Sequence, residues 1–479
     1  MNKLHSFTSL HGPWGSYDWS KDTSILVKTD ASVVLGGRTP VIQTTKSLLE
    51  QHEESIPLLY LSKTFREAVL VCRTLGIRFL WIDSLCIIQD DPQDWERESA
   101  KMADVYSGSY LNLAAAAAVD GTEGLFFPRL ERIKVRCKLP SGEQDDVFVS
   151  NSPSSYFMDS KESPLASRAW ALQEKVLPPR TLIFGKDQLH WECHEELKSE
   201  SSCKNMQIDQ SFSSGLRRYL SSEPQPNEKI SVQCKLWYNM LEAYTRCNLT
   251  KSEDKLPALA GLANAFSRRS GFRYAAGLWE EDLEMGLLWK PPSPIDTQLP
   301  PRYRALSWSW AALDAKVKYF RNMQKAYSSY ALVQNLRLQG LQGSEDIFGQ
   351  VASGTKLFLT GRLKNIDLLA DFESEIAYPW KLMDGQHHIG YATTDNYYPS
   401  ASTIDAETCC LPILKLITAK TADNRANPFE IYALILAAMG VGNTYQRIGI
   451  GVIRDTELEN IGPDHNPFED TEEAEIVLL

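Results

Sequence analysis

The chain has 479 residues and carries 50 basic against 61 acidic side chains, a formal charge of −11. Apolar residues make up 43% and charged residues 23%, which excludes wholesale disorder, and the length predicts several domains at about 150 residues each. The acidic balance excludes a generic nucleic-acid binder, because phosphate neutralisation requires a basic face.

The sequence gives no sign of secretion or of membrane insertion. The N-terminal segment lacks the apolar stretch of a signal peptide, and no apolar run reaches the roughly 18 residues of a membrane span. The longest run, 431–442, predicts a buried strand. Nine scattered cysteines, an odd number, favour reduced thiols over a disulfide framework. We therefore expect a cytoplasmic protein with no membrane span.

The first part of the chain alternates between helix and strand patterns. Residues 1–30 predict an irregular N-terminal extension, and Ala31–Leu35 predicts a short strand. A helical apolar stripe then occupies Ser62 to Gly76, and residues 78–82 predict a buried strand. A helix opened by Asp91-Pro92 should carry Trp95, Ser99, Met102 and Tyr106. Residues 110–118 fit either a strand or a helix, and their place after a helix favours the strand. Hairpin strands are predicted within 131–160, a helix over 166–176, and strands at 181–184 and 188–191.

The second part of the chain changes character twice. Residues 196–228 are polar and Ser-rich and predict a linker, 229–300 predict a mostly helical region, and 301–479 predict a β-rich region with a frayed acidic tail. The predicted fold is an α/β domain over 31–195, built on a mostly parallel sheet flanked by helices. A helical middle and a β-rich C-terminal region follow it, so the class is α+β overall.

Common catalytic motifs are absent from the sequence. It contains no GxGxxG after a strand, no phosphate-binding GxxxxGK[ST], no GxSxG and no HExxH. Cys193, His194 and Cys203 lack the spacing of a closed zinc site. The sequence therefore predicts no metal site and no resident cofactor.

Four other segments form an unusual set. They are residues 80–89 (LWIDSLCIIQ), Asp94-Trp95 through Tyr106, residues 124–129 (GLFFPR) and residues 167–174 (SRAWALQE). Together they resemble the HET (heterokaryon incompatibility) domain of filamentous fungi over roughly residues 32–195. Motifs common among such proteins follow at Tyr244-Thr245, 254–258 (DKLPA), 276–279 (AGLW), Tyr303-Arg304 and 307–310 (SWSW).

The resemblance implies a role in non-self recognition and regulated cell death when genetically different hyphae fuse. It also implies a distant likeness to TIR domains, some of which cleave NAD+ with a helical glutamate in a Trp-Cys-Leu-x-Glu stretch. Trp170 and Glu174 stand at the same offset here, which makes Glu174 the candidate catalytic residue and NAD+ the candidate substrate. By analogy with TIR pockets, the resemblance also implies self-association, together with an unidentified protein recognition partner.

Elementary chemistry supports the same assignment. Residues four apart share a helix face, so Trp170 and Glu174 would lie together. A carboxylate stabilises the positive charge that develops on ribose when an N-glycosidic bond breaks. Arg168 has the planar fork that suits a phosphate, and Asp83 follows a strand, where α/β sheets bind ligands. We therefore assign Asp83, Arg168 and Trp170 to substrate binding.

Each residue also has a structural alternative. Trp81 and Trp170 fit a hydrophobic core as well as a stacking surface. Asp83 is suited to hydrogen-bond the turn that follows it. Cys86 is typical of a small buried apolar group, and Glu98 is expected to pair with Lys101 or another surface cation instead of taking part in catalysis.

The chain departs from the family at one place. The usual opening strand, Leu-Ser-Tyr/His-Cys-Trp-Gly, is replaced by residues 32–37 (SVVLGG), which keep only the glycines. A degenerate member, an altered gene model at this end, and a domain with other chemistry all fit this departure. Whether the chain is an enzyme thus stays open, with two alternatives to NAD+ cleavage: a non-enzymatic signalling module, or a HET-type protein recruited to secondary-metabolite biosynthesis.

Overall fold

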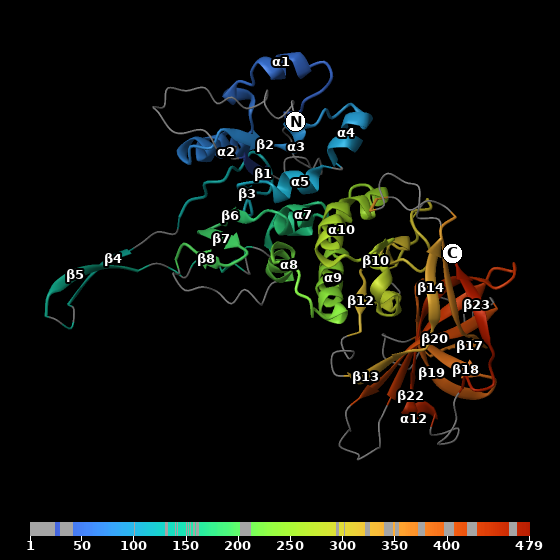
Figure 1. Cartoon of the computed structure of the whole chain (residues 1–479). Coiled ribbons are helices and arrows are strands. Elements are labelled where there is room, and N and C mark those ends of the chain that lie inside the picture. The colour runs from blue at the N-terminus through green and yellow to red at the C-terminus, as the bar shows by residue number, and fades with distance from the viewer. Residues whose placement is uncertain are drawn as a thin grey trace. The chain divides into compact units, whose positions relative to one another are not determined.

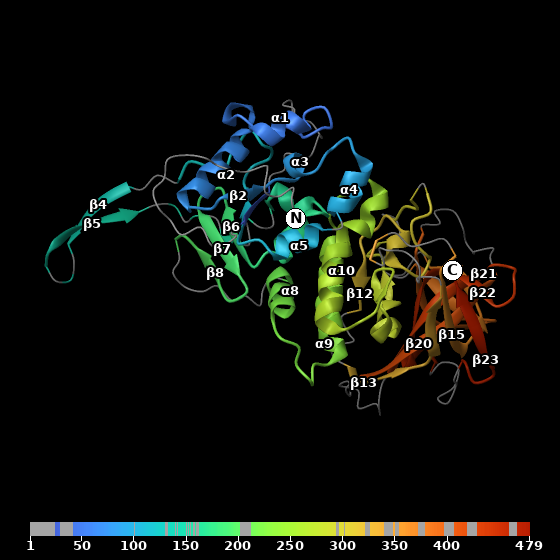
Figure 2. The same ribbon diagram turned by 45° about the horizontal axis from the view of Figure 1, so that its top comes forward.

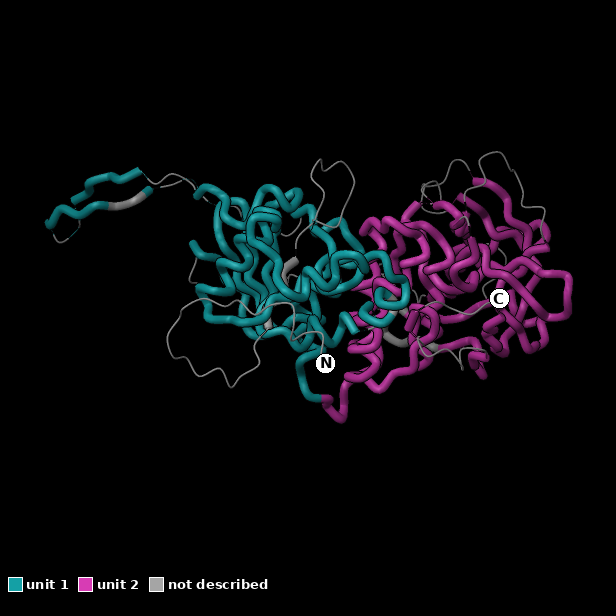
Figure 3. Tube along the Cα trace, turned by 90° about the horizontal axis from the view of Figure 1, so that it is seen from above, with its two compact units in different colours: residues 1–223 teal, residues 224–479 magenta. Residues whose placement is uncertain are grey.

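The structure is a computed structural model. It describes residues 24–28, 42–99, 101–129, 133–138, 140, 142–149, 151, 153, 155–156, 159, 162–201, 212–293, 297–300, 302–320, 326–339, 348–349, 354–371, 379–396, 407–418, 429–458 and 467–479. The chain divides into two compact units, Met1–Glu223 (unit 1) and Pro224–Leu479 (unit 2), which Figure 3 shows in different colours. The predicted strand at 31–35 and the departure at 32–37 lie outside the described residues.

Unit 1 is built on a mixed sheet in which, over the described residues, six strands have the order β2-β1-β3-β6-β7-β8 (Figure 1). The bounds are β1 Ser24–Lys28, β2 Phe79–Trp81, β3 Leu111–Ala114, β6 Arg180–Phe184, β7 Leu189–Cys193 and β8 Leu197–Ser199. Neighbours from β2 to β6 are parallel, whereas β7 and β8 add antiparallel pairs. The predicted α/β class is confirmed, although the sheet is mixed, and β1 lies in a stretch predicted to be irregular.

Along the chain, short helices lie between and after the strands of this sheet. They are α1 Leu49–Glu54, η3 Leu58–Tyr60, α2 Lys63–Thr74, α3 Asp83–Cys86, α4 Pro92–Ser99, α5 Met102–Ser107, η4 Pro164–Ser167, α7 Ala171–Val176 and α8 Phe212–Ser221. The predicted α2 is confirmed: the Ser62 hydroxyl accepts from the Phe65 amide at its start, and Gly76 takes a positive φ of 69° after its end. Its apolar face packs with β2 and β3 in one core.

Two predicted helices are each divided in the structure. The helix expected to run from Pro92 to Tyr106 is two helices: α4 ends at Ser99 and α5 begins at Met102, and Trp95 on α4 is 39% exposed whereas Met102 and Tyr106 on α5 are buried. The helix predicted over 166–176 is a short 3-10 turn, η4, followed by α7, because Arg168 between them has an extended backbone. Periodicity alone continues across both breaks and could not reveal them.

The predicted linker at 196–228 contains two ordered elements of unit 1, β8 and α8. α8 buries Ser214, Leu216, Arg217 and Tyr219, so this Ser-rich helix contributes to the interior. Its amphipathic spacing was hidden by serine, which has no clear apolar signature.

The predicted hairpin is confirmed as a separate two-stranded sheet of β4, Ile133–Lys138, and β5, Gln144–Val149 (Figure 2). It is largely exposed, with Ile133 at 67% and Val149 at 50% of full accessibility. Its ion pairs link Asp146 to Lys134 and Arg136.

Unit 2 begins with the predicted helical region. It contains α9 Ile230–Tyr244, η6 Ser252–Lys255, α10 Pro257–Ser270, η7 Glu280–Asp282, α11 Leu283–Gly286 and η9 Trp310–Ala312, together with the short strands β9 Tyr274–Ala275, β10 Leu278–Trp279, β11 Trp289–Lys290 and β12 Lys318–Tyr319. Its centre is aromatic: Trp237, Phe266 and Trp279 are fully buried and their rings contact one another.

The rest of unit 2 is a large, mostly antiparallel sheet, as the β-rich composition predicts. In the described residues, the strands are β13 Ala326–Ala331, β14 Gln334–Gln339, β15 Lys356–Arg362, β16 Lys364–Asn365, β17 Asp367–Ala370, β18 Trp380–Asp384, β19 His387–Thr394, β20 Thr408–Thr418, β21 Phe429–Ala438, β22 Thr444–Arg454 and β23 Glu473–Leu478. A short helix, α12 Asp455–Leu458, lies between β22 and β23. The buried strand predicted at 431–442 is β21.

The acidic tail is not frayed as predicted, at least over β23. This strand pairs antiparallel with β15 and parallel with β22, and it buries Ile476 and Leu478. Its alternation of buried and partly exposed residues is that of a strand with one face toward a core. Pairing with two distant strands therefore outweighs the local acidic composition.

Candidate functional site

A small pocket lies over one face of the unit 1 sheet. Its volume is about 70 Å³. Asn112 and Ala114 on β3 lie opposite Thr181 and Ile183 on β6, and these four residues form its floor. The other lining residues come from β7, η4, α7 and the segments between: Ala116, Tyr156, Ser163, Leu165, Ala166, Ala171, Glu174, Lys175 and Glu192.

Glu174, the candidate catalytic residue, lines this pocket. It lies in the middle of α7 and is half-buried, so its carboxylate is neither fully solvated nor sealed into the core. The Asn112 amide donates to the Glu174 backbone carbonyl at 3.1 Å. This contact ties the helix that carries Glu174 to the floor of the pocket.

Three of the four predicted site residues lie close enough to Tyr106 to shift the pKa of its phenol. Burial raises the pKa of this phenol well above its ordinary value, and the nearby carboxylates of Glu174 and Asp83 raise it further, whereas Arg168 lowers it. Tyr106 is only 5% exposed, so it stays protonated at neutral pH and can donate a hydrogen bond. Tyr106 belongs to one of the four family-like segments, but its position in the sequence does not indicate a role at the site.

Trp170, the fourth predicted residue, has a different neighbourhood. It lies immediately before α7, and its ring meets that of Trp95 edge to face at 6.2 Å. Trp170 does not appear among the residues that line the pocket beside Glu174. Trp81 is 8% exposed and meets Tyr106 edge to face at 5.8 Å, so its core alternative is confirmed.

Asp83 and Cys86 lie together after β2. The Asp83 carboxylate accepts from the Ser84 amide at 2.6 Å, the turn-forming contact considered for it, while its charge also reaches Tyr106. Burial raises the pKa of the Cys86 thiol to about 12, and the carboxylates of Asp83 and Glu98 add to this rise. Cys86 is therefore a neutral thiol, not a nucleophilic thiolate.

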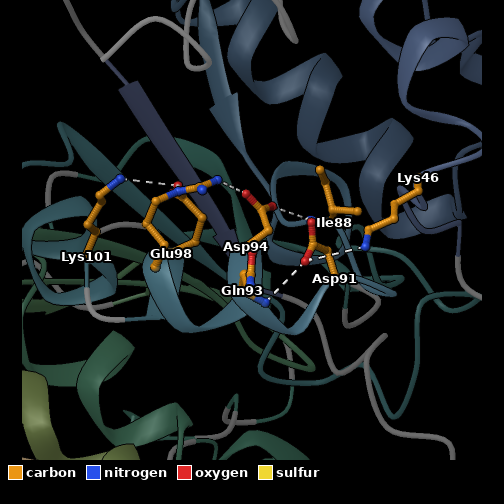
Figure 4. A network of polar contacts seen from close by, with 8 residues as sticks. Lys46, Ile88, Asp91, Gln93, Asp94, Glu98 and Lys101 are labelled. Atoms are coloured by element: carbon orange, nitrogen blue, oxygen red, sulfur yellow. Dashed lines mark hydrogen bonds and ion pairs between the residues drawn. The ribbon is translucent and has the colours of Figure 1, made fainter.

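Hydrogen bonds and ion pairs form a polar network along α4 and the residues on either side of it (Figure 4). Glu98 pairs with Lys101 at 3.3 Å, as predicted, and with Arg97 at 3.2 Å. Asp94 accepts from the Ile88 amide at 2.9 Å and pairs with Arg97. The buried Asp94 thus ties α4 to the segment before it, while Glu98 pairs with Arg97 and Lys101 near the end of the helix.

The pocket wall contains a buried charged group that the sequence analysis missed. Glu192 on β7 is 1% exposed and forms a 2.8 Å ion pair with Arg217 on α8. Its carboxylate also accepts from the hydroxyls of Tyr156 and Ser214, each at 2.9 Å. Burial would raise the pKa of Glu192, but the charges of Arg217 and Lys175 outweigh it and hold this pKa below its usual value.

Fold and pocket together define unit 1 as an α/β domain with a small, mostly apolar pocket on one face of its sheet, into whose lining a few charged side chains are set. Within it, residues 16–174 match the family model described as Heterokaryon incompatibility protein (HET), about a third of the chain. The chain therefore carries a HET domain over these residues, and the matched stretch ends at Glu174. No curated protein and no solved structure matches the chain.

The motifs beyond the HET domain assemble a core in unit 2. The indole nitrogens of Trp237 and Trp310 both donate to the Gly277 carbonyl at 3.1 Å, and the Ser309 hydroxyl donates to the Ala276 carbonyl at 2.6 Å. The Tyr244 hydroxyl donates to the Lys255 carbonyl at 2.5 Å. These motif residues therefore hold one another and have a structural role here.

Metal and membrane features can be stated for the part of the chain that the structure describes. It holds no group of three or more His, Cys, Asp or Glu side chains arranged to bind a metal ion. Eight cysteines, from Cys72 to Cys410, are free thiols. None of the helices described has the length and apolarity needed to cross a bilayer.

Proposed function

We propose that the HET domain acts in non-self recognition that leads to cell death, and that its pocket cleaves NAD+ at the bond between nicotinamide and ribose. The observation that carries the proposal is Glu174, a half-buried carboxylate that lines a pocket beside the parallel strands. Further support comes from Tyr106, near which Glu174, Asp83 and Arg168 converge. A TIR-like arrangement of the domain is part of this proposal.

In the proposed reaction, the bond between ribose C1′ and the nicotinamide nitrogen breaks and its electron pair neutralises the pyridinium ring. Water forms a new bond to C1′ and releases one proton, so the products are nicotinamide, ADP-ribose and H⁺. Glu174 stabilises the positive charge that develops on the ribose. Tyr106 keeps that carboxylate oriented, and Arg168 serves a phosphate of the substrate.

The size of the pocket sets a condition on this reaction. A cavity of about 70 Å³ is far below the roughly 300 Å³ at which pockets for small molecules begin. Binding the ribose ring therefore requires η4, which lines the pocket through Leu165 and Ala166, to move away from the floor formed by β3 and β6. The proposal thus includes an opening of the pocket before the chemical step.

Replacing Glu174 by Gln tests the catalytic assignment, because the amide keeps the shape of the side chain and removes its charge. We expect the rate of nicotinamide release from NAD+, measured by chromatography, to fall at least about a hundredfold. A rate loss of this size is typical when one group that stabilises a transition state is removed. Glu98→Gln is the matched control, since Glu98 belongs to the α4 surface network. It should retain wild-type turnover.

Equal turnover by Glu174→Gln and the wild-type protein would show that Glu174 is not catalytic. Near-UV circular dichroism of each variant separates loss of chemistry from loss of fold. The same pair, overexpressed in a fungal host, extends the test to toxicity, where only Glu174→Gln should spare the cells.

A second function is favoured by the small pocket itself. A cavity of this size holds only a few water molecules. A domain that signals by binding a partner needs no larger cavity, because it has no substrate to enclose. Under this alternative, folded protein at high concentration releases no nicotinamide, and Glu174→Gln kills cells as well as the wild-type protein does. These two results together select the interaction module over the enzyme.

A further inference from the structure

We infer that Arg217, which lies beyond the HET match, is a positioning residue for Glu174: from α8 it joins the buried Glu192 of β7 to the backbone of α7. The inference rests on the proposed function for its catalytic consequence. Its structural part, that Arg217 fixes the helix carrying Glu174, can be tested without NAD+.

The first step is the contact between Arg217 and α7. The guanidinium Nη2 donates to the backbone carbonyl of Lys175, the residue next to Glu174. Asn112 donates to the carbonyl of Glu174 itself at 3.1 Å. The last carbonyls of a helix lack intrahelical partners, so two successive carbonyls at the end of α7 are held by side chains from β3 and α8.

Arg217 is itself held in place by a buried ion pair with Glu192. Its side chain and that of Glu192 are each 1% exposed and form an ion pair of 2.8 Å. The hydroxyls of Tyr156 and Ser214 also donate hydrogen bonds to the Glu192 carboxylate. A buried ion pair of this kind is costly to disturb, because removal of one charge leaves the other unpaired away from water.

The third step concerns the length and isolation of α7. This helix has only six residues, and an isolated helix so short is unstable in water. Its position therefore depends on contacts with other elements, which for its C-terminal carbonyls include Asn112 and Arg217. The functional domain accordingly extends beyond residue 174 to include β7 and α8.

The deciding variant is Arg217→Lys, which keeps a positive charge for Glu192 but loses the fork that also reaches the Lys175 carbonyl. We expect amide hydrogen exchange over residues 171–176 to rise at least tenfold, with exchange in α2 and β6 unchanged. The matched control is Arg218→Lys, because Arg218 is the exposed neighbour on the same helix. It should leave the exchange of α7 as in the wild-type protein.

The double variant Glu192→Gln/Arg217→Met provides a second test if Arg217→Lys does not fold, since it leaves no unpaired buried charge. It should show the same local rise in exchange. Unchanged exchange in α7, or an equal rise throughout unit 1, would overturn the inference, because the first denies the contact and the second indicates general destabilisation.

Activity supplies the catalytic part of the test. If the wild-type protein releases nicotinamide, Arg217→Lys should lower kcat at least tenfold while KM for NAD+ changes less than twofold, and an unchanged kcat would overturn the catalytic consequence. If the wild-type protein releases none, the proposed function fails, whereas the exchange data still decide whether Arg217 positions α7.

Discussion

Each unit buries an arginine–carboxylate pair, but the surroundings of the two pairs differ. In unit 1, Glu192, the ion-pair partner of Arg217, lines a pocket whose lining also includes the half-buried Glu174 and Lys175. In unit 2, Arg447 pairs with Asp395 at 3.1 Å, donates to the carbonyls of Leu287 and Trp289, and lies 3.4 Å from the Trp289 ring centre.

The comparison shows that a buried charge by itself does not indicate a functional site. Arg447 is enclosed by backbone acceptors and an aromatic ring, an arrangement that serves the fold. The pair of Arg217 and Glu192 in unit 1 is equally buried, but Glu192 lines a cavity whose lining also includes the charged residues Glu174 and Lys175. A cavity with partly exposed charges beside it is therefore the feature that separates the two regions.

Removal of Arg447 should have the largest effect. Arg447→Met leaves Asp395 buried and unpaired and removes two hydrogen bonds to carbonyls, so we expect a loss of about 3–5 kcal/mol in the free energy of unfolding of unit 2. Hydrogen exchange during urea titration measures it unit by unit. The control is the surface pair of Arg337 and Glu475, whose side chains are 65% and 59% exposed: Arg337→Met should cost less than about 1 kcal/mol. Similar losses for both variants would contradict a structural role for the buried pair.

Gly277→Ala should have the next largest effect, because it disturbs the core of unit 2 directly. Gly277 has a φ of 95°, and an added Cβ would lie 2.5 Å from the Trp310 indole nitrogen that donates to its carbonyl. Backbone strain and overpacking together predict a loss of about 3 kcal/mol.

Gly271→Ala is the control for Gly277→Ala. Gly271 also has a positive φ, of 76°, but nothing lies within 4 Å of an added Cβ. It should lose only about 1 kcal/mol, the cost of the left-handed backbone. If thermal unfolding shows equal losses at the two glycines, the close contact with Trp310 is not what the core depends on.

The pH dependence of unit 2 should be a smaller effect. Burial and the nearby charge of Arg304 lower the pKa of Lys255 from 10.5 to about 7. Between pH 7 and 10 the unfolded chain therefore binds more protons than the folded one, so stability should rise with pH by at most about 1.4 kcal/mol per unit. Lys255→Met should flatten this slope in urea titrations at successive pH values, whereas Lys251→Met, at an exposed site, should not.

The hairpin of unit 1 should give the smallest effect. Asp146→Asn removes the pairs with Lys134 and Arg136, whose side chains are 57% and 71% exposed, so we expect less than about 1 kcal/mol and unchanged exchange in α7. The melting temperature and exchange data check this. A large loss would mean that β4 and β5 support the pocket, and the contrast between site and periphery would need revision.

Much of the fold could be predicted because it is encoded locally. The helix over 63–74 has a capping serine, an apolar stripe and a terminal glycine, and the hairpin has alternating residues around a turn. Predictions failed where distant pairing outweighs local composition. β23 is acidic but lies between β15 and β22, and α8 is Ser-rich but is held inside unit 1 through Arg217.

The candidate site divides in the same way. The offset of Trp170 and Glu174 is a local pattern, and it identified the carboxylate that lines the pocket. The partners of that site are distant: Arg217 reaches a carbonyl 42 residues away, and Glu192 meets Tyr156 across 36. No spacing rule connects such residues, so nothing in the sequence beyond their polar character points to them.

By itself, the sequence determined the order of the main elements, the HET motifs and the carboxylate at residue 174, because each depends on residues close together in the chain. Only the tertiary structure decided that Tyr106 lies among Asp83, Arg168 and Glu174, that Glu192 and Arg217 stand behind α7, and that the tryptophan motifs of unit 2 hold its core. The physical reason is that burial, pairing of charges and satisfaction of hydrogen bonds arise from contacts between distant segments, which form only when the chain has folded.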